Sequence, residues 1–549
     1  MKKIINITSI LLLASFIRLY QLSGLPISLF GDEIDVGYHA WSLWTTGRDY
    51  MGHFLPTYIQ SLAEWRAPLL MYFTAPFVGL LGPSTVSVRL FPALMGILNI
   101  YLVHSLCKIL FPKSKSIPLS AAFLLAVTPW HIHYSRAAFE VTLLLNLILG
   151  GVIFYLKDKL SLSFILFALT FYTYSTANIF VPLLVLGILV IYPHKIKTIA
   201  SSAVFASILC LPIAYNLFFG EVSTRFGLVS IFQDFKVTEE VVINRTEPWV
   251  TQGLVESIFH NKYLVYTTNF IHNYLTSFSS QFLFISGDPN FRHSIGGFGE
   301  FLWPVALLVP FIFVYFYKNK LTKSHKLLLW WLAISPVASS LTVGGGSHST
   351  RLFVMLPALV IIFSFGFIML KYLPRVIFVG LMFLVLFTYW HRYSHHYRFL
   401  SAKQWNYGYK QIFTQLSALQ GNFKNIFINN TYQPSLISYA FYSKLPPANF
   451  QKMFHGDKVV DGIYPEFNGF IFSDHIYFGE AVGPFVIDHV TKDNGIYLSA
   501  QGREAPGNWD WIKDAPGGTK SLGGVYTPMG EPLFHLLTQF ENPILKTLE

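Results

Sequence analysis

The sequence predicts an all-α polytopic membrane protein with about 11 transmembrane helices, followed by a C-terminal extracytoplasmic domain of the α/β or α+β class. Three observations predict this: the apolar composition, a series of apolar runs of spanning length, and lysine clusters between those runs. Hydrophobic residues make up 53% of the 549 residues and charged residues only 12%. One water-soluble core cannot hide so much apolar surface, so a membrane must be the solvent for much of it.

The apolar runs set the expected number of spans. A helix needs about 20 apolar residues to cross the hydrocarbon core of a bilayer. The acceptable runs are residues 4 to 20, 86 to 111, 117 to 133, 138 to 156, 160 to 175, 177 to 192, 198 to 219, 300 to 317, 327 to 343, 352 to 370 and 374 to 390. The first is taken as a retained span, because no clear small-residue cleavage site follows it. A shorter run, 67 to 82, contains Pro76 and is placed at the membrane interface.

The lysine clusters test this count, because basic residues of short loops collect on the cytoplasmic side. With a cytoplasmic N-terminus, every cluster falls inside: Lys2 and Lys3; Lys108, Lys113 and Lys115; Lys157 and Lys159; Lys195 and Lys197; Lys318, Lys320, Lys323 and Lys326; Lys371 and Arg375. The formal charge of +11 is therefore topological, and no nucleic acid partner is expected. The two cysteines, Cys107 and Cys210, lie in apolar runs and predict neither disulfides nor a thiolate metal site.

This topology divides the chain into a membrane domain, 1–390, and an extracytoplasmic soluble domain, 391–549. The membrane domain carries long external loops at about 21–85 and 220–299, and the C-terminus lies outside. In the soluble domain, short runs such as Asn425 to Ile428, Gly469 to Phe472 and Phe485 to Val490 are typical of strands separated by turns. An integral, multi-pass protein of the plasma membrane is expected.

The first external loop holds a cluster of acids directly after the first span. Asp32, Glu33 and Asp35 lie within four residues of one another, beside a membrane surface, and must be solvated, paired or functional. The plain alternative is a solvated loop face or a helix N-cap at Asp32. Farther along, Tyr38 precedes Arg66, a cation at the depth of a lipid phosphate, for which a snorkelling interface anchor is the competing interpretation.

The other external loops place cations and histidines at the mouths of later spans. Arg136 and Glu140 are four residues apart and would share a helix face, so a structural ion pair competes with a functional role. His131 and His133 are two apart and make a poor metal pair on a helix. The remaining candidates are Arg292 and His293 before span eight, and His348 and Arg351 before span ten.

Acids beside cations at an outer membrane surface suit transfer from an anionic lipid. The cations would hold the phosphate leaving group while a carboxylate deprotonates the acceptor. A transporter or lipid-linked sugar flippase is the alternative that the span count permits, and a scaffold or receptor is a third. Transporters usually carry polar residues in mid-membrane and show repeated halves, whereas these spans are nearly free of acids and show no repeat.

The chain also resembles a known family, the polyprenyl-phosphate-sugar-dependent glycosyltransferases of family 39 with the GT-C fold. These include the protein O-mannosyltransferases and the lipid A aminoarabinose transferase. The residues that carry the resemblance are Gly31 to Glu33, Thr46 to Asp49, Gly52 to Pro56, Arg66 to Leu69, Ser87 to Ala93, Ser135, Arg136, Glu140, Gly287 to Ser294 and His348 to Pro357.

The resemblance implies an inverting transfer of a hexosyl or pentosyl group, outside the cytoplasm, from a polyprenyl-phosphate donor to a protein, lipid or glycan acceptor. By carry-over, Asp32 is the general base, with Glu33 and Glu140 as further catalytic acids. Arg66 replaces the lysine of a Lys-Pro-Pro-Leu pattern that contacts the lipid phosphate. The expected substrate contacts are Tyr38, Arg66, Arg136, Arg292, His293, His348 and Arg351. No cofactor is certain; a divalent metal is compatible with the family, with no ligands assigned.

Overall fold

The computed structural model describes the chain except residues 1–5, 63–64, 220–228, 247–252, 431–434, 455–459, 465–466, 482, 501–503, 505–510, 512, 514, 517 and 541–549. Contacts between Cα atoms divide it into two compact units. The first contains Met1–Leu22, Trp65–Leu70 and Arg89–Ser394, and the second contains Ser23–Glu64, Met71–Val88 and His395–Glu549. The division into a membrane domain 1–390 and a soluble domain 391–549 therefore stays a prediction.

Every apolar run that was predicted to span contains helix in the structure. The helices of the first part of the chain are α1 (Ile7–Leu19), α3 (Leu69–Leu81), α4 (Thr85–Leu110), α5 (Ser116–Val127), α6 (Pro129–Tyr134), α7 (Val141–Leu156), α8 (Leu160–Thr170), α9 (Ala177–Ile191) and α10 (Ile196–Phe219). After them come α12 (Phe235–Thr246), α13 (Leu254–Phe259), α14 (Lys262–Thr276), η1 (Gln281–Ile285), η2 (Trp303–Leu308), α15 (Val309–Lys318), α16 (Lys323–Ile334), α17 (Val337–Ser340), η3 (Gly345–Ser347), α18 (Ser349–Leu352), η4 (Phe353–Met355), α19 (Leu356–Met369) and α20 (Tyr372–His391).

Four helical segments of the described residues are long and apolar enough to cross a membrane: Thr85–Leu110, Ile196–Asn216, Ser349–Met369 and Tyr372–Leu400. Other apolar helices are shorter, between 10 and 17 residues. The run 117 to 133 is not one continuous helix, because α5 ends at Val127 and α6 starts at Pro129, which suits the first turn of a helix. The count of eleven spans is thus not confirmed by length, and it stays a prediction.

The second unit contains α2 (Gly31–Thr46), which lies within the segment predicted as the first external loop. Every residue from Glu33 to Ala40 is buried, so this helix is packed on several sides. It stops at Gly47, whose φ of 67° is a left-handed conformation that glycine adopts without strain. The short strand β1 (Ile59–Gln60) follows in the same unit, whereas β2 (Trp65–Arg66) belongs to the first.

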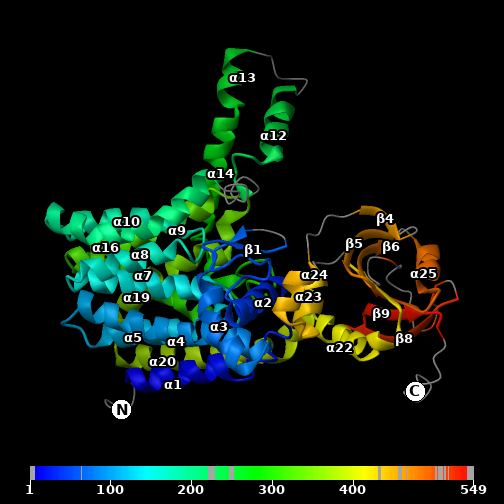
Figure 1. The fold of residues 1–549 in the computed structure, drawn as a ribbon. Helices are drawn as coiled ribbons and strands as arrows, with labels where there is room; N and C mark the ends of the chain where they lie inside the picture. Colours follow the sequence, from blue (N-terminus) through cyan, green and yellow to red (C-terminus); the bar gives the residue numbers. More distant parts are fainter. Residues whose placement is uncertain are drawn as a thin grey trace. The chain divides into compact units, whose positions relative to one another are not determined.

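The C-terminal part of the second unit is built on a seven-stranded mixed sheet, drawn in orange, yellow and red in Figure 1. Its strands are β3 (Asn425–Asn429), β4 (Val460–Tyr464), β5 (Phe467–Ser473), β6 (Ile476–Ala481), β7 (Gly495–Ala500), β8 (Lys520–Tyr526) and β9 (Pro532–Thr538), in the order β4-β5-β6-β3-β7-β9-β8. Its helices are α21 (Arg398–Leu400), α22 (Tyr409–Leu419), α23 (Ser435–Tyr442), α24 (Pro447–Met453) and α25 (Pro484–Thr491), with short helical turns η5 (Arg392–Tyr397) and η6 (Gln420–Asn422) before β3.

The centre of this sheet is parallel, since β3 runs parallel to both β6 and β7, while its outer pairs are antiparallel. All six residues of β7 are buried, as expected for a central strand covered on both faces. The sequence correctly predicted β3 and β5. The prediction of a strand at Phe485 to Val490 was wrong: these residues form α25, whose Val486, Ile487 and Val490 pack into the core with Phe427 and Tyr497.

The carboxyl group of the half-buried Glu504 lies next to the parallel strands. Glu504 accepts hydrogen bonds from the hydroxyl of Tyr497 on β7 and from the backbone N–H of Ala500, the latter at 2.7 Å. Asn429, at the end of β3, donates to the Tyr497 hydroxyl at 3.3 Å. Burial raises the pKa of the Glu504 carboxyl from 4.5 to about 7. Glu504 therefore carries its proton in the folded protein at pH values where the unfolded chain has lost it.

Glu504→Gln should remove a pH dependence of stability around β7. The folded state binds the extra proton between about pH 4.5 and about pH 7, so wild-type stability falls as the pH rises through that window and is level above it. The glutamine side chain stays neutral throughout. From low to high pH, the free energy of unfolding of the variant should therefore rise relative to that of the wild type by up to about 3 kcal/mol.

Hydrogen exchange of β7 peptides in the full chain, corrected for intrinsic rates, measures this difference. The control is Glu531→Gln, the same change at an exposed residue. Parallel pH profiles for the wild type and Glu504→Gln would contradict the assignment of the raised pKa to this carboxyl group.

Candidate active site

In the first unit, the segment from α6 to Glu140 is buried and is held by two arginines. Arg18, on α1, donates from Nε to the hydroxyl of Ser135 at 3.1 Å and contacts Nδ1 of His131 at 2.7 Å. Ser135 fits there because Gly96 on α4 has no side chain: a Cβ at Gly96 would collide with the Cβ of Ser135. His131 is therefore a packed residue in contact with a cation, which explains its position without a metal.

Arg136 is the second of these arginines, and it is fully buried. It donates to the carbonyl oxygens of Ile17 and Tyr20 at 2.5 and 2.7 Å, which lie at the C-terminal end of α1. Its guanidinium also lies over the rings of Trp390 and Tyr393, 5.5 and 5.7 Å from their centroids. These contacts give Arg136 a structural role at the end of the first span.

Glu140 does not pair with Arg136, which was one alternative from the sequence. It forms an ion pair with Arg66, with 2.6 Å between Arg66 Nη2 and Glu140 Oε1, and α7 begins only at Val141. The two side chains are 6% and 13% exposed, so solvent screens this pair little. The structure thus brings together two predicted site residues that are 74 positions apart in the chain.

In the second unit, the predicted acids lie in the first turns of α2. The helix begins at Gly31, with Phe30 as its N-cap, so Asp32 is exposed in the first turn and is not the cap itself. Glu33 is buried, and its Oε2 accepts a weak hydrogen bond of 3.4 Å from the backbone N–H of Phe30. A carboxylate in the first turn is favoured by the helix dipole. Of the acids Asp32 and Glu33, the first is the more accessible to a ligand.

Farther along α2, aromatic residues fill the helix face. The buried Tyr38 donates from its hydroxyl to the carbonyl oxygen of Leu445 at 2.9 Å, and burial raises its pKa. Asp35 accepts from the hydroxyl of Tyr50 at 2.8 Å, and the ring of His39 stacks on Tyr50 with centroids 3.8 Å apart. Tyr38 therefore holds α2 to a C-terminal segment of the same unit.

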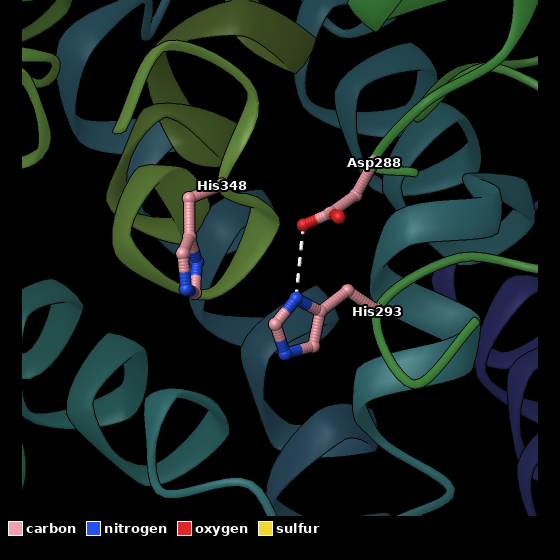
Figure 2. Close-up of side chains that lie close together, drawn as sticks. All are labelled: Asp288, His293 and His348. Carbon is pink, nitrogen blue, oxygen red and sulfur yellow. Dashed lines mark hydrogen bonds and ion pairs between the residues drawn. The ribbon is translucent and has the colours of Figure 1, made fainter. Parts of the chain in front are cut away.

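The third predicted group converges around Asp288 in the first unit (Figure 2). His293 Nδ1 lies 2.9 Å from Asp288 Oδ2, and this same oxygen accepts the backbone N–H of Ser349 at 2.9 Å. The other carboxylate oxygen accepts the N–H of Asn290 at 2.8 Å. Burial raises the Asp288 pKa, but the hydrogen bonds and the charge of His293 outweigh it, so the net shift is downward. Asp288 is thus held ionised inside the protein.

His348 lies opposite the Asp288 and His293 pair in Figure 2, with its ring centroid 4.8 Å from that of His293. Burial lowers the pKa of His348 to about 3, helped by the charge of Arg351. Its Nδ1 is buried and has no hydrogen-bond partner among the residues that the structure describes.

The two predicted arginines of this group make other contacts. Arg351 donates to the hydroxyl of Thr342 at 2.6 Å, and the carbonyl oxygen of Arg292 lies 2.8 Å from Nε2 of His133.

Glu300 completes this buried network, and it was not among the site residues predicted from the sequence. Its Oε1 accepts the N–H of Asp288 at 3.1 Å and the hydroxyl of Ser349 at 2.5 Å. It stands just before the apolar helical segment that starts at Trp303. A narrow, partly open cavity is lined by His133, His293 and Glu300 together with aromatic residues. It has space for about one water molecule beside these titratable groups.

The structure therefore brings the predicted residues together in separate groups. Arg66 with Glu140, and Asp288 with His293 and His348, belong to the first unit. Asp32, Glu33 and Tyr38 belong to the second unit. Arg18, Asp288 and Glu300 were missed as site residues; the signal for all three was a charged side chain at the edge of an apolar run, where burial demands a partner.

Comparison with known proteins gives a match over part of the sequence. Residues 65–218 match the family model of the dolichyl-phosphate-mannose-protein mannosyltransferases. This stretch includes both Arg66 and Glu140. No curated protein sequence matches the chain.

Solved structures match over nearly the full length. ArnT from Cupriavidus metallidurans bound to undecaprenyl phosphate is 12% identical, with a TM-score of 0.54, covering 96% of this chain and 97% of that one. The same enzyme in the apo state gives a TM-score of 0.52 at 11% identity, with the same coverage. The oligosaccharyltransferase AglB from Archaeoglobus fulgidus, at a TM-score of 0.45 and 12% identity over 80% of this chain and 63% of that one, is too distant in fold to add to this.

These matches confirm the resemblance found in the sequence. The chain is mostly helical, with four apolar helices long enough to cross a membrane among its described residues and a C-terminal sheet domain, and it shares the architecture of ArnT. The chain has the GT-C fold of the polyprenyl-phosphate-sugar glycosyltransferases, and its residues 65–218 carry the sequence pattern of the dolichyl-phosphate-mannose-protein mannosyltransferase family.

Proposed function

We propose that this protein is an inverting glycosyltransferase that moves a hexosyl or pentosyl group from a polyprenyl phosphate, such as undecaprenyl phosphate, to an extracytoplasmic acceptor. The observation that carries the proposal is the full-length fold match to an ArnT structure with undecaprenyl phosphate bound. The match of residues 65–218 to a lipid-phosphate-mannose transferase family supports the same donor class. The acceptor is a protein, a lipid or a glycan.

In the proposed reaction, Asp32 acts as the general base. Its carboxylate takes the proton of the acceptor hydroxyl, the acceptor oxygen bonds to the anomeric carbon, and the bond from that carbon to the phosphate oxygen breaks. The polyprenyl phosphate leaves with the bonding electron pair, and the configuration at the anomeric carbon inverts. Its exposure in the first turn of α2 supports this role for Asp32, whereas Glu33 is buried and is better suited to fix the start of the helix.

Arg66 is proposed to bind the lipid phosphate, since a guanidinium forms charge-assisted hydrogen bonds with phosphate oxygens. Glu140 holds one end of this guanidinium at 2.6 Å and so restricts its orientation. We therefore assign Glu140 the role of orienting Arg66. In this role Glu140 does not act as a base and does not touch the acceptor. Arg292, His293, His348 and Arg351 remain proposed substrate contacts, while the carbonyl contacts of Arg136 favour a structural role over substrate binding.

The topology proposed from the lysine clusters accompanies this function. It has eleven spans, a cytoplasmic N-terminus and the C-terminal sheet domain outside the cytoplasm. The activity is tested with the purified full chain in liposomes that contain a polyprenyl-phosphate sugar labelled in the sugar. A transferase releases the unlabelled lipid phosphate and labels the acceptor, whereas a flippase moves the donor across the bilayer intact.

Asp32→Asn should lower kcat for sugar transfer by at least about 100-fold, because the amide cannot accept the acceptor's proton. The KM for the lipid-linked donor should change little, since Asp32 is not assigned to phosphate binding. Initial rates at varied donor concentration separate the two constants.

The matched control is Asp158→Asn, a change of the same chemistry at an exposed residue with a left-handed φ of 60°, which asparagine tolerates. This variant should retain wild-type kcat. If Asp32→Asn also kept the wild-type kcat, the assignment of the base would be wrong.

Arg66→Gln should raise the donor KM by about 10-fold or more, because a charge-assisted hydrogen bond to phosphate is lost. The single change also strands the buried Glu140 carboxylate, so it should lower the unfolding temperature as well. In the double variant Arg66→Gln, Glu140→Gln, neither charge is stranded, and stability should recover while the donor KM stays high.

Glu140→Gln alone keeps the arginine charge and should raise the donor KM less than Arg66→Gln does. A double variant in which stability and donor KM both return to wild-type values would show that Arg66 acts only through packing, and would remove it from the phosphate site.

A further inference from the structure

We propose that Asp288, His293 and His348 bind a divalent metal ion, with zinc as the best fit. Each of the three residues offers one ligand atom, and these atoms all lie within 4.8 Å of one another. The side chains come from two segments of the first unit, the loop before η2 and the turn before α18, and converge on one point in Figure 2. This inference does not depend on the proposed transferase activity, since it concerns metal binding alone.

The distances fit one ion with a small adjustment. Zinc lies about 2.0 to 2.2 Å from nitrogen and carboxylate ligands, so two ligands of one tetrahedral ion are about 3.3 to 3.6 Å apart. The carboxylate oxygen of Asp288 and Nδ1 of His293 are 2.9 Å apart and hydrogen-bonded, so ion binding requires Nδ1 to lose its proton and the two atoms to separate by about 0.5 Å. The longest separation, no more than 4.8 Å, must shorten by about 1 Å, which is within reach of a rotation of the His348 side chain.

The buried Nδ1 of His348 gives an independent reason to expect a ligand. It has no hydrogen-bond partner among the described residues, although it lies in an interior where polar atoms are nearly always paired. The ring of His348 lies 4.8 Å from that of His293, measured between centroids, so a cation in this group could accept a lone pair from each ring. A metal ion would satisfy this nitrogen.

The surroundings hold the carboxylate ligand in place. Asp288 receives backbone N–H groups from Asn290 and Ser349, so its orientation is set before any ion binds. Glu300 contacts the backbone of Asp288 and the hydroxyl of Ser349, which ties both segments together. Because the carboxylate is already oriented, less conformational entropy is lost when a metal ion binds.

The ligand set selects the class of metal. Imidazole nitrogen suits zinc, copper and nickel, whereas magnesium and calcium prefer sites made of oxygen atoms only. Two histidines and one carboxylate match zinc sites that keep a fourth position open for water or an anion. The narrow cavity lined by His133, His293 and Glu300 shares His293 with this group and has space for about one water molecule.

The test uses the purified full chain without an affinity tag, stripped with a chelator and then titrated with zinc against a chromophoric competitor. We expect one tight site per chain for zinc and none for magnesium. His293→Gln and His348→Gln should each weaken this site by at least about 100-fold, more than the loss of an outer contact would. The control is His272→Gln, an exposed histidine on α14 outside the group, which should leave the site intact.

Cobalt(II) in place of zinc provides a second measurement that needs no variant. Tetrahedral coordination by nitrogen and oxygen gives a strong visible absorption, which should appear with one equivalent of cobalt and vanish with zinc. Absence of this absorption in the wild type, or zinc affinities of His293→Gln and His348→Gln equal to the wild type, would overturn the proposal. Sugar transfer is not part of the readout, so the result is independent of the proposed function.

Discussion

The buried carboxylate of Asp288 is the interaction on which the interior of the first unit most depends. An ionised acid inside a protein is stable only when hydrogen bonds and cations compensate for lost water. Here the compensation comes from the N–H groups of Asn290 and Ser349 and from His293, and Glu300 binds the backbone of the same loop. The loop before η2 and the start of α18 are thereby fixed to each other. The carbonyl oxygen of Glu300 also accepts the N–H of Trp130, which extends the network to α6.

Elsewhere in the unit, buried arginines also form hydrogen bonds that compensate for lost water. Arg18 and Arg136 satisfy carbonyl oxygens and hydroxyls around α1 and α6, and they fix the segment that leads to Glu140. Glu140 in turn orients Arg66. A cation that is to bind a phosphate has to be held in a fixed orientation, and the ion pair with Glu140 fixes one end of the guanidinium. Stability and the proposed phosphate site thus rest on the same buried charges.

Much of the fold was predictable because apolar runs and lysine positions are local signals. The run 86 to 111 became α4, Thr85–Leu110, almost residue for residue, and β3 was expected at Asn425 to Ile428. The strand predicted at Phe485 to Val490 failed because a short run rich in apolar residues suits either a strand or a buried helix, and Pro484 at the first helical turn decided for α25. The candidate residues were found by type, but their partners were not: His293 and His348 are 55 positions apart, and Glu140 stands just before α7, outside the helix that would have paired it with Arg136. Such pairings depend on tertiary packing that spacing alone does not contain.

We propose that this chain recognises a lipid through its phosphate. The most direct measurement is native mass spectrometry of the purified full chain in detergent, with undecaprenyl phosphate and undecaprenol offered in equal amounts. The two lipids share the polyprenyl chain and differ only in the phosphate group. We expect the phosphorylated lipid to occupy the protein and undecaprenol not to displace it. Equal occupancy by the two lipids, or by neither, would contradict it.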